Sequence, residues 1–245
     1  MQGGLLSLAW VLLAGMAHAA PAPDPVLVLG RISDNPKAHY EQLQPLLDYV
    51  VARMHDVGIR EGRILMARDP QQMASYLRRG RVDWVTETAG TAVALGLRSG
   101  AQPLLLTERS GVREYHTVFF VRRDSALQRV EDLRGHRLAL QNTASTSAYL
   151  VPVMTLLERG VTPQILAGNW DVPGPDAVGY VFARSELNVA TFVHKGLADG
   201  GAVSSVDWDD EARVPAAFRR DFRVLLRTEP YPRAVEVVRG DLEIG

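Results

Sequence analysis

Short apolar runs alternate with amphipathic helical segments along most of this chain, and this alternation restricts the folds open to it. Residues 25–32 (PVLVLGRI) are rich in Val and Leu and predict a buried strand. In residues 40–57, apolar side chains recur at i, i+3, i+4 and i+7, which places them on one helical face. The same order continues to residues 103–107 and starts again at His136. Strands that alternate with helices predict mainly parallel sheets flanked by helices, the α/β class.

The strand-like segment 115–121 (YHTVFFV) interrupts this order and suggests two lobes. We expect residues 26–121 to form the first lobe, residues 122–205 the second, and residues 206–245 to return to the first. Ligands of open α/β sheets bind beyond the carboxyl ends of strands, close to helix N-termini. Candidate ligand residues are therefore sought where strands end.

The N-terminal residues have the pattern of an export signal. Residues 5–16 are mostly apolar, too few to span a bilayer, and Ala17 and Ala19 fit the small-x-small rule for cleavage. We expect residues 1–19 to be a signal peptide and residues 20–25 a spacer; the alternative is a buried N-terminal helix. The chain has no Cys, which excludes a lipid anchor on a mature N-terminal Cys. The mature protein is therefore expected to be soluble and periplasmic, without membrane insertion.

The composition excludes several functional classes. Lys and Arg (27) nearly balance Asp and Glu (28), so no strong basic field favours nucleic acid. The six His residues are scattered, and neither a zinc-protease motif, nor a Gly-x-Ser-x-Gly elbow, nor a phosphate-binding Gly-rich loop is present. We expect no metal, no cofactor and no enzymatic activity.

A cluster of hydroxyl side chains follows one predicted strand. Residues 138–152 read LALQNTASTSAYLVP, so Ser145, Thr146 and Ser147 precede a predicted helix over residues 147–159. Unpaired N–H groups at a helix N-terminus bind anions, and neighbouring hydroxyls add donors. The pattern predicts an oxyanion site. Ordinary N-capping by one hydroxyl is the alternative, and Pro152 allows a kink or a late helix start.

Further candidates follow other predicted strands. Thr86, Glu87 and Thr88 could bind the ligand from the first lobe, or could cap a helix. Because a carboxylate repels a dianion, Glu87 would suit an ammonium group or a protonated oxygen. Asp199 precedes two glycines, so it could accept a bond from the ligand or could be a turn residue.

Three other side chains have two interpretations. Tyr40 could cover the ligand or pack at the edge of its helix. Arg31 ends the first strand, where it could pair with an anion or stay exposed. Tyr115 could touch the ligand or pack within its strand.

Several segments together resemble the phosphate-, phosphite- and phosphonate-binding periplasmic solute receptors of ABC transporters. The segments that carry this resemblance are the hydroxyl cluster, residues 83–88 (DWVTET), residues 115–121, residues 130–135 (VEDLRG), residues 196–202 (GLADGGA) and residues 231–232. The resemblance implies a type II periplasmic-binding fold with the ligand in the cleft between two lobes. It also implies a small oxyanion ligand, a membrane ABC permease as partner and a monomer. Arg184 stands close to where this family commonly has a His.

Other functions stay open at this point. The same fold could be a sensory module that feeds a membrane kinase. A secreted hydrolase could use Ser145 as nucleophile, although no His base lies nearby in the sequence. A scaffold that has lost its ligand is a further alternative.

Overall fold

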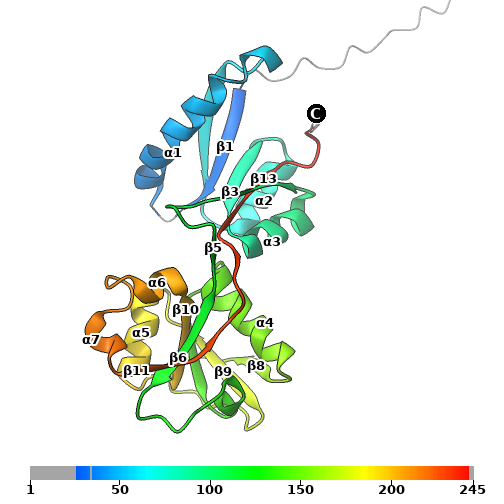
Figure 1. The fold of residues 1–245 in the computed structure, drawn as a ribbon. Helices are drawn as coiled ribbons and strands as arrows, with labels where there is room; N and C mark the ends of the chain where they lie inside the picture. Colours follow the sequence, from blue (N-terminus) through cyan, green and yellow to red (C-terminus); the bar gives the residue numbers. More distant parts are fainter. Residues whose placement is uncertain (1–25, 34, 243–245) are drawn as a thin grey trace, which may run out of the picture.

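Two separate β-sheets divide the chain into two lobes (Figure 1). The computed structural model describes residues 26–33 and 35–242. The first sheet has the strand order β2-β1-β3-β13-β4, and the second has the order β11-β6-β10-β7-β9-β8. Where a helix connects two neighbouring strands, those strands are mostly parallel to each other. Both sheets are therefore mixed but mainly parallel. The expected α/β class is confirmed.

The first lobe contains both ends of the described chain. Its strands are β1 (Val26–Ile32), β2 (Glu61–Ala67), β3 (Trp84–Glu87), β4 (Gln102–Thr107) and β13 (Ala234–Val238). Its helices are α1 (Pro36–Val51), the short 3-10 turn η1 (His55–Val57), α2 (Pro70–Arg78) and α3 (Ala89–Ser99).

The second lobe lies between the two passages of the chain. Its strands are β6 (Thr117–Arg122), β7 (Arg137–Leu140), β8 (Thr162–Ile165), β9 (Ala177–Phe182), β10 (Gly200–Ser204) and β11 (Phe222–Arg227). Its helices are η2 (Val130–Leu133), the π-helical turn η3 (Thr146–Leu150), α4 (Val151–Glu158), α5 (Glu186–His194), α6 (Ser205–Asp209) and α7 (Ala216–Arg219).

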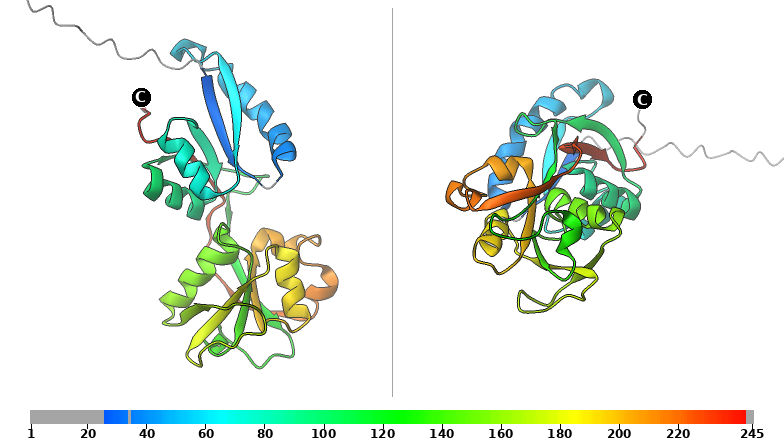
Figure 2. Two further views of the ribbon diagram at one scale, coloured as in Figure 1. Left: turned by 180° about the vertical axis from the view of Figure 1, so that it is seen from behind. Right: turned by 60° about the horizontal axis from the view of Figure 1, so that its bottom comes forward.

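Two short strands join the lobes where the chain crosses between them. β5 (Glu114–Tyr115) pairs antiparallel with β12 (Tyr231–Pro232), so the two crossings are hydrogen-bonded to each other. The rings of Tyr115 and Tyr231 meet edge to face, with centroids 4.8 Å apart. The crossings run side by side between the lobes in Figure 1 and in the left view of Figure 2.

The lobe boundaries differ from those expected at residues 121 and 206. β6 belongs to the second sheet, and so does β11, so the second lobe extends from about Thr117 to Arg227. The apolar run VFFV explains this placement, because Phe119 and Phe120 point to opposite faces of β6 and enter two different cores. The return to the first lobe begins only after β12.

Local capping explains where the helices begin. The Asn35 side chain accepts the Ala38 N–H at the start of α1, and Asp69 caps α2 in the same way, each followed by a Pro that favours the first helical turn. The helix expected over residues 40–57 therefore begins four residues earlier and ends at Val51. A kink or late start near Pro152 is confirmed, since regular α-helix begins at Val151 after the π turn.

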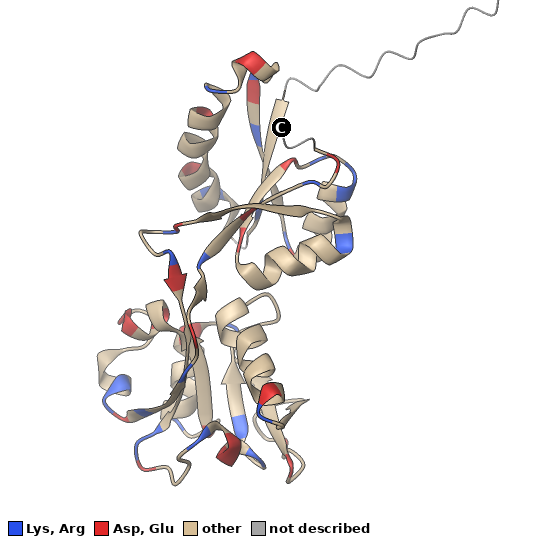
Figure 3. Cartoon of the chain, turned by 45° about the vertical axis from the view of Figure 1, so that its right-hand side comes forward, with Lys and Arg blue, Asp and Glu red and all other residues tan. Residues whose placement is uncertain are grey.

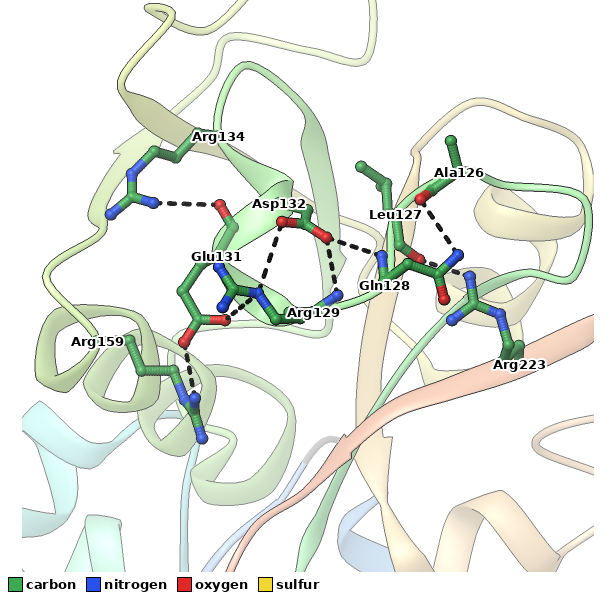
Figure 4. Close-up of polar contacts among 9 residues, drawn as sticks. All are labelled: Ala126, Leu127, Gln128, Arg129, Glu131, Asp132, Arg134, Arg159 and Arg223. Atoms are coloured by element: carbon green, nitrogen blue, oxygen red, sulfur yellow. Dashed lines mark hydrogen bonds and ion pairs between the residues drawn. The ribbon is translucent and has the colours of Figure 1, made fainter.

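Ion pairs hold the surface segment between β6 and β7 (Figure 4). The Asp132 carboxylate accepts the backbone N–H groups of Gln128 and Arg129, and Glu131 lies 2.8 Å from Arg159. Both signs of charge are interspersed over the two lobes in Figure 3. Within residues 26–33 and 35–242, no helix has the length and apolarity to cross a membrane. Those same residues contain no cluster of three or more His, Asp or Glu that could hold a metal ion.

Candidate functional site

The hydroxyl cluster lies at the seam between the lobes. It follows the carboxyl end of β7 and faces the N-terminus of α3 in the first lobe, which is the position that the sequence predicted for ligand residues. Its three hydroxyls have different roles. The Ser145 Oγ accepts the Ala148 N–H at 3.0 Å, so this side chain is an N-cap.

Thr146 joins the two lobes directly. Its Oγ1 accepts the Gly90 N–H at 3.1 Å and donates to the Thr88 Oγ1 at 2.8 Å. The Thr88 hydroxyl donates to Thr91 (3.3 Å), whose hydroxyl donates to the Ala144 carbonyl (3.4 Å). This chain of hydrogen bonds, which we call the interlobe latch, passes from the second lobe to the first and back. Thr146 and Thr88 are therefore brought together, but their hydroxyls bind each other.

Gly90 permits this close approach of the lobes. A Cβ at this position would lie 2.6 Å from Leu150 Cδ2 and 2.7 Å from the Thr146 Oγ1. Side chains at this position would push α3 away from the hydroxyl cluster.

Ser147 lies on the other side of the latch, beside the crossings. It is buried, and its carbonyl accepts the Thr117 Oγ1 at 2.8 Å. The hydroxyls of Tyr115 and Tyr231 lie close to that of Ser147, and the Tyr231 hydroxyl donates to the Thr117 Oγ1 at 2.8 Å. Burial raises the pKa of both tyrosines, so both stay neutral near neutral pH. Three neutral hydroxyl groups therefore meet at one point between the lobes.

Three arginines gather beside these hydroxyls. Arg31, at the end of β1, and Arg109, after β4, both donate to the Thr86 carbonyl, at 3.2 and 3.3 Å. The Arg233 guanidinium lies 4.8 Å from the ring centroid of Tyr115. Burial, together with repulsion from Arg31 and Arg233, lowers the pKa of Arg109 to about 10. The guanidiniums are thus close enough to repel one another, and we call them the arginine cluster.

One carboxylate, that of Glu87, lies next to the arginine cluster. It is buried, and its Oε1 lies 4.0 Å from the Arg31 Nη1, beyond hydrogen-bond distance. Burial raises its pKa, although Arg31 and Arg109 oppose that shift. Besides Glu87, which lies next to Arg31 and Arg109, the Asp207 carboxylate acts on Tyr115, so three guanidiniums outnumber two carboxylates there.

Three of the ligand residues predicted from the sequence lie away from the arginine cluster and its hydroxyls. The Thr86 hydroxyl points to the opposite sheet face and donates to Glu236 at 2.6 Å. Asp199 lies at the start of β10, the end away from the cleft, where it accepts the Arg137 N–H at 2.8 Å. Tyr40 is about half exposed on α1, close to the carboxyl end of β1. We therefore leave Thr86 and Asp199 out of the candidate site.

Sequence reasoning missed Arg109, Arg233 and Tyr231 as site residues, and it favoured strand packing for Tyr115 and an exposed position for Arg31 over a ligand role. Arg109 and Arg233 lie in irregular segments near the crossings, where no periodic pattern indicates direction. Both arginines lie close to the crossings in the sequence, but only the three-dimensional structure shows that this position brings them together.

An apolar cavity in the described part of the chain is a separate feature. It measures about 490 Å³ and lies on the first lobe, between α1 and β4, with a mostly apolar lining that includes Met54, Trp84 and Leu105. Val26, the first residue of β1, lines it, whereas the last residues of β1 face the second lobe. The cavity is thus remote from the cleft, and its apolar lining does not suit an oxyanion.

Two mixed sheets, paired crossings and a polar cleft between the lobes define a two-lobed binding protein of the type II periplasmic class. The family model described as "ABC transporter, phosphonate, periplasmic substrate-binding protein" matches residues 29–244. The chain therefore belongs to this family, as the resemblance implied. Its members are substrate-binding proteins, not enzymes, which agrees with the expectation for this chain.

Solved structures support this assignment. The XAC2383 protein of Xanthomonas citri, bound to a chloride ion, is 59% identical, with a TM-score of 0.85 over 90% of this chain and 79% of that chain. The same protein bound to ATP matches at 58% identity with a TM-score of 0.84 and the same coverage. PhnD1 of Prochlorococcus marinus, in complex with methylphosphonate, is 19% identical with a TM-score of 0.60 over 89% and 78% of the two chains. At that identity the likeness shows the fold alone.

Proposed function

We propose that this protein captures a small phosphorus oxyanion (phosphate, phosphite or a phosphonate) in the cleft between its lobes. The observation that carries the proposal is the arginine cluster, in which Arg31 and Arg109 lie beside the Glu87 carboxylate and Arg233 lies beside Arg109. Buried charges of one sign are stable only when a counter-charge arrives. A ligand with two negative charges would supply it.

Neutral donors complete the proposed site. Ser147 and Tyr115 offer hydroxyls from the second lobe and the crossings, while the arginines come from the first lobe and the crossings. The Tyr231 hydroxyl donates to Thr117 and lies beside them. A ligand held between them would contact both lobes and both crossings, so its binding would favour closure. Tyr40 could cover the ligand from α1.

A second candidate ligand is the phosphate group of a nucleotide. The Xanthomonas citri protein, 58% identical to this chain, was solved bound to ATP. The arginine cluster would bind a terminal phosphate of a nucleotide by the same guanidinium–phosphate contacts that bind inorganic phosphate. The two candidates differ in whether the ligand extends beyond the phosphorus group.

Calorimetric titration of residues 20–245 tests both candidates. The ligands are phosphate, phosphite, methylphosphonate, aminoethylphosphonate, ATP and AMP, in gluconate rather than chloride buffers, because the Xanthomonas citri protein was solved with chloride. We expect micromolar or tighter binding of one phosphorus anion, weakened at least about tenfold by Arg109→Met. Arg129→Met, at an exposed site in the second lobe, is the matched control. If Arg109→Met bound every ligand of the panel as tightly as the parent protein does, the proposal would be contradicted.

The family also suggests the place of action and the partner. We propose export through the signal peptide at residues 1–19, which lies outside the described residues, followed by delivery of the ligand to a membrane ABC permease by a monomer. N-terminal sequencing of the protein from a periplasmic fraction would show Ala20 if cleavage follows Ala19. Membrane-retained full-length chain would contradict this part of the proposal.

A further inference from the structure

The Glu87 carboxylate has one oxygen without a hydrogen-bond partner. The side chain is only 7% exposed, and its Oε1 is buried with no donor in reach. Among the described residues, the Arg239 Nε is also buried without a hydrogen-bond partner, but it lies 2.8 Å from the Asp83 Oδ1 and so has an ionic partner. The Glu87 Oε1 is thus a buried acceptor without a hydrogen-bond donor, and its one ionic contact, with Arg31, is long at 4.0 Å.

The surrounding groups are committed elsewhere. The backbone at Thr88 and Ile32 lies next to the carboxylate and favours its charged form, which partly offsets the rise in its pKa that burial causes. Arg31 and Arg109 both donate to the carbonyl of Thr86, and the shortest approach of Arg31 to Glu87 is 4.0 Å. The free oxygen therefore lies beside Arg31 and Arg109, two members of the arginine cluster, next to which the proposed ligand would bind.

We propose that Glu87 determines specificity by sharing one proton with an oxygen of the bound anion, so that the cleft selects oxyanions that still carry a hydroxyl proton over sulfate and sulfonates. This inference rests on the proposed function and names the ligand class more narrowly. Phosphate, phosphite and phosphonates can bring such a proton near neutral pH. Sulfonates cannot, because a sulfonic acid has a single acidic proton and is already ionised at very low pH.

The physical reason is repulsion between two anionic oxygens in a buried setting. The arginine cluster attracts any oxyanion, sulfonate or phosphonate alike, because guanidinium groups do not distinguish phosphorus from sulfur. A carboxylate that faces a ligand oxygen repels it unless a proton lies between them. The arginines therefore attract every oxyanion. Glu87 repels those without a proton and so supplies the selectivity between ligands.

A sulfonate could bind only if Glu87 took a proton from solution. Burial raises the pKa of Glu87, so this proton uptake becomes easier as the pH falls towards the acidic range. The other titratable groups around it are Arg31, Arg109, Arg233 and Tyr115. Arg109 has a pKa of about 10 and the pKa of Tyr115 is raised, so Arg109 stays charged and Tyr115 stays neutral between pH 5 and 8.

Methylphosphonate and methanesulfonate form a matched pair of ligands for the test. Calorimetric titration at pH 5, 6.5 and 8 compares the parent protein with Glu87→Gln. We expect the parent to prefer methylphosphonate at least about tenfold at pH 6.5, and Glu87→Gln to bind methanesulfonate at least about tenfold tighter than the parent does. Glu236→Gln, a buried carboxylate on the opposite sheet face, is the matched control and should keep the parent preference.

The pH arm needs no variant and covers the case in which Glu87→Gln does not fold. Methanesulfonate has the same charge at all three pH values, so a change in its affinity reports the protein. We expect its affinity for the parent to rise as the pH falls. A pH-independent affinity, or equal weakening of both ligands by Glu87→Gln, would overturn this inference while leaving the proposed function intact. No binding of either ligand, or of the wider panel, by the folded parent would overturn both.

Discussion

The Thr146 Oγ1 donates a 2.8 Å hydrogen bond to the Thr88 Oγ1, and these two residues belong to different lobes. The bond is part of the interlobe latch, which also includes the Gly90 N–H, the Thr91 hydroxyl and the Ala144 carbonyl. Because each hydroxyl proton points to the next acceptor, the latch has one direction throughout. Closure of the lobes is therefore stabilised by groups of the protein itself, and ligand affinity includes this contribution.

Thr146→Val should weaken closure without changing the charge or the shape of the cleft. The substitution removes the donor to Thr88 and the acceptor for Gly90, each worth about 1 kcal/mol when buried. We expect the dissociation constant of every ligand to rise by the same factor, about five- to thirtyfold. Calorimetry over the anion panel measures it, with Thr143→Val in the same loop as control. A loss confined to one ligand would show instead that Thr146 contacts that ligand.

Gly90→Ala should separate the lobes by steric contact alone. The added Cβ would lie within 2.7 Å of Leu150 and Thr146, so α3 must move away from the hydroxyl cluster. We expect a larger radius of gyration in small-angle X-ray scattering and weaker ligand binding. Gly96→Ala in the same helix meets only the Ala101 carbonyl, at 3.2 Å, and serves as the control. An unchanged radius together with unchanged affinity would show that the latch does not limit closure.

Arg109→Met should weaken ligand binding and stabilise the ligand-free protein. Burial and two neighbouring guanidiniums lower the pKa of Arg109 to about 10, so its charge at neutral pH costs on the order of 3 kcal/mol. The native state disfavours the charged form, so this cost is fully present below about pH 10 and falls as the pH rises above it. We expect the free energy of unfolding at pH 7 to rise by about 1–2 kcal/mol in urea titrations. Lower stability would mean that the arginine cluster is already neutralised in the free protein.

Strand and helix patterns predicted most of the fold because burial dictates them. The run 25–32 became β1 as expected, since its apolar residues enter the cores on both sides of the sheet. β8 was not predicted, because its four residues are mostly exposed and include a Pro and a Gln. The lobe boundaries were misplaced because a sequence pattern does not show which sheet a strand joins.

The candidate site was predicted only in part, for reasons of geometry. The hydroxyl cluster was located correctly at the seam, but three consecutive hydroxyls point in three directions: Ser145 into its own helix, Thr146 across the seam and Ser147 to the tyrosines. The residues around Thr86 also point in different directions, because successive side chains of a strand face opposite sides of the sheet. Glu87 faces the arginine cluster, and Thr86 cannot face it too.

Thr86→Val should therefore lower stability and leave ligand affinity unchanged. The Thr86 hydroxyl and the Trp84 Nε1 both donate to the buried Glu236, at 2.6 and 2.5 Å, on the sheet face opposite Glu87. Removal of one donor to a buried carboxylate should lower the free energy of unfolding by about 1.5–3 kcal/mol in urea titrations. The backbone carbonyl of Thr86, which accepts from Arg31 and Arg109, is kept in the variant, so calorimetry should give the parent affinity. In the Glu236→Gln background the same substitution should have a smaller effect on stability, because the charged acceptor is gone. Weaker anion binding by Thr86→Val at full stability would return this hydroxyl to the ligand site.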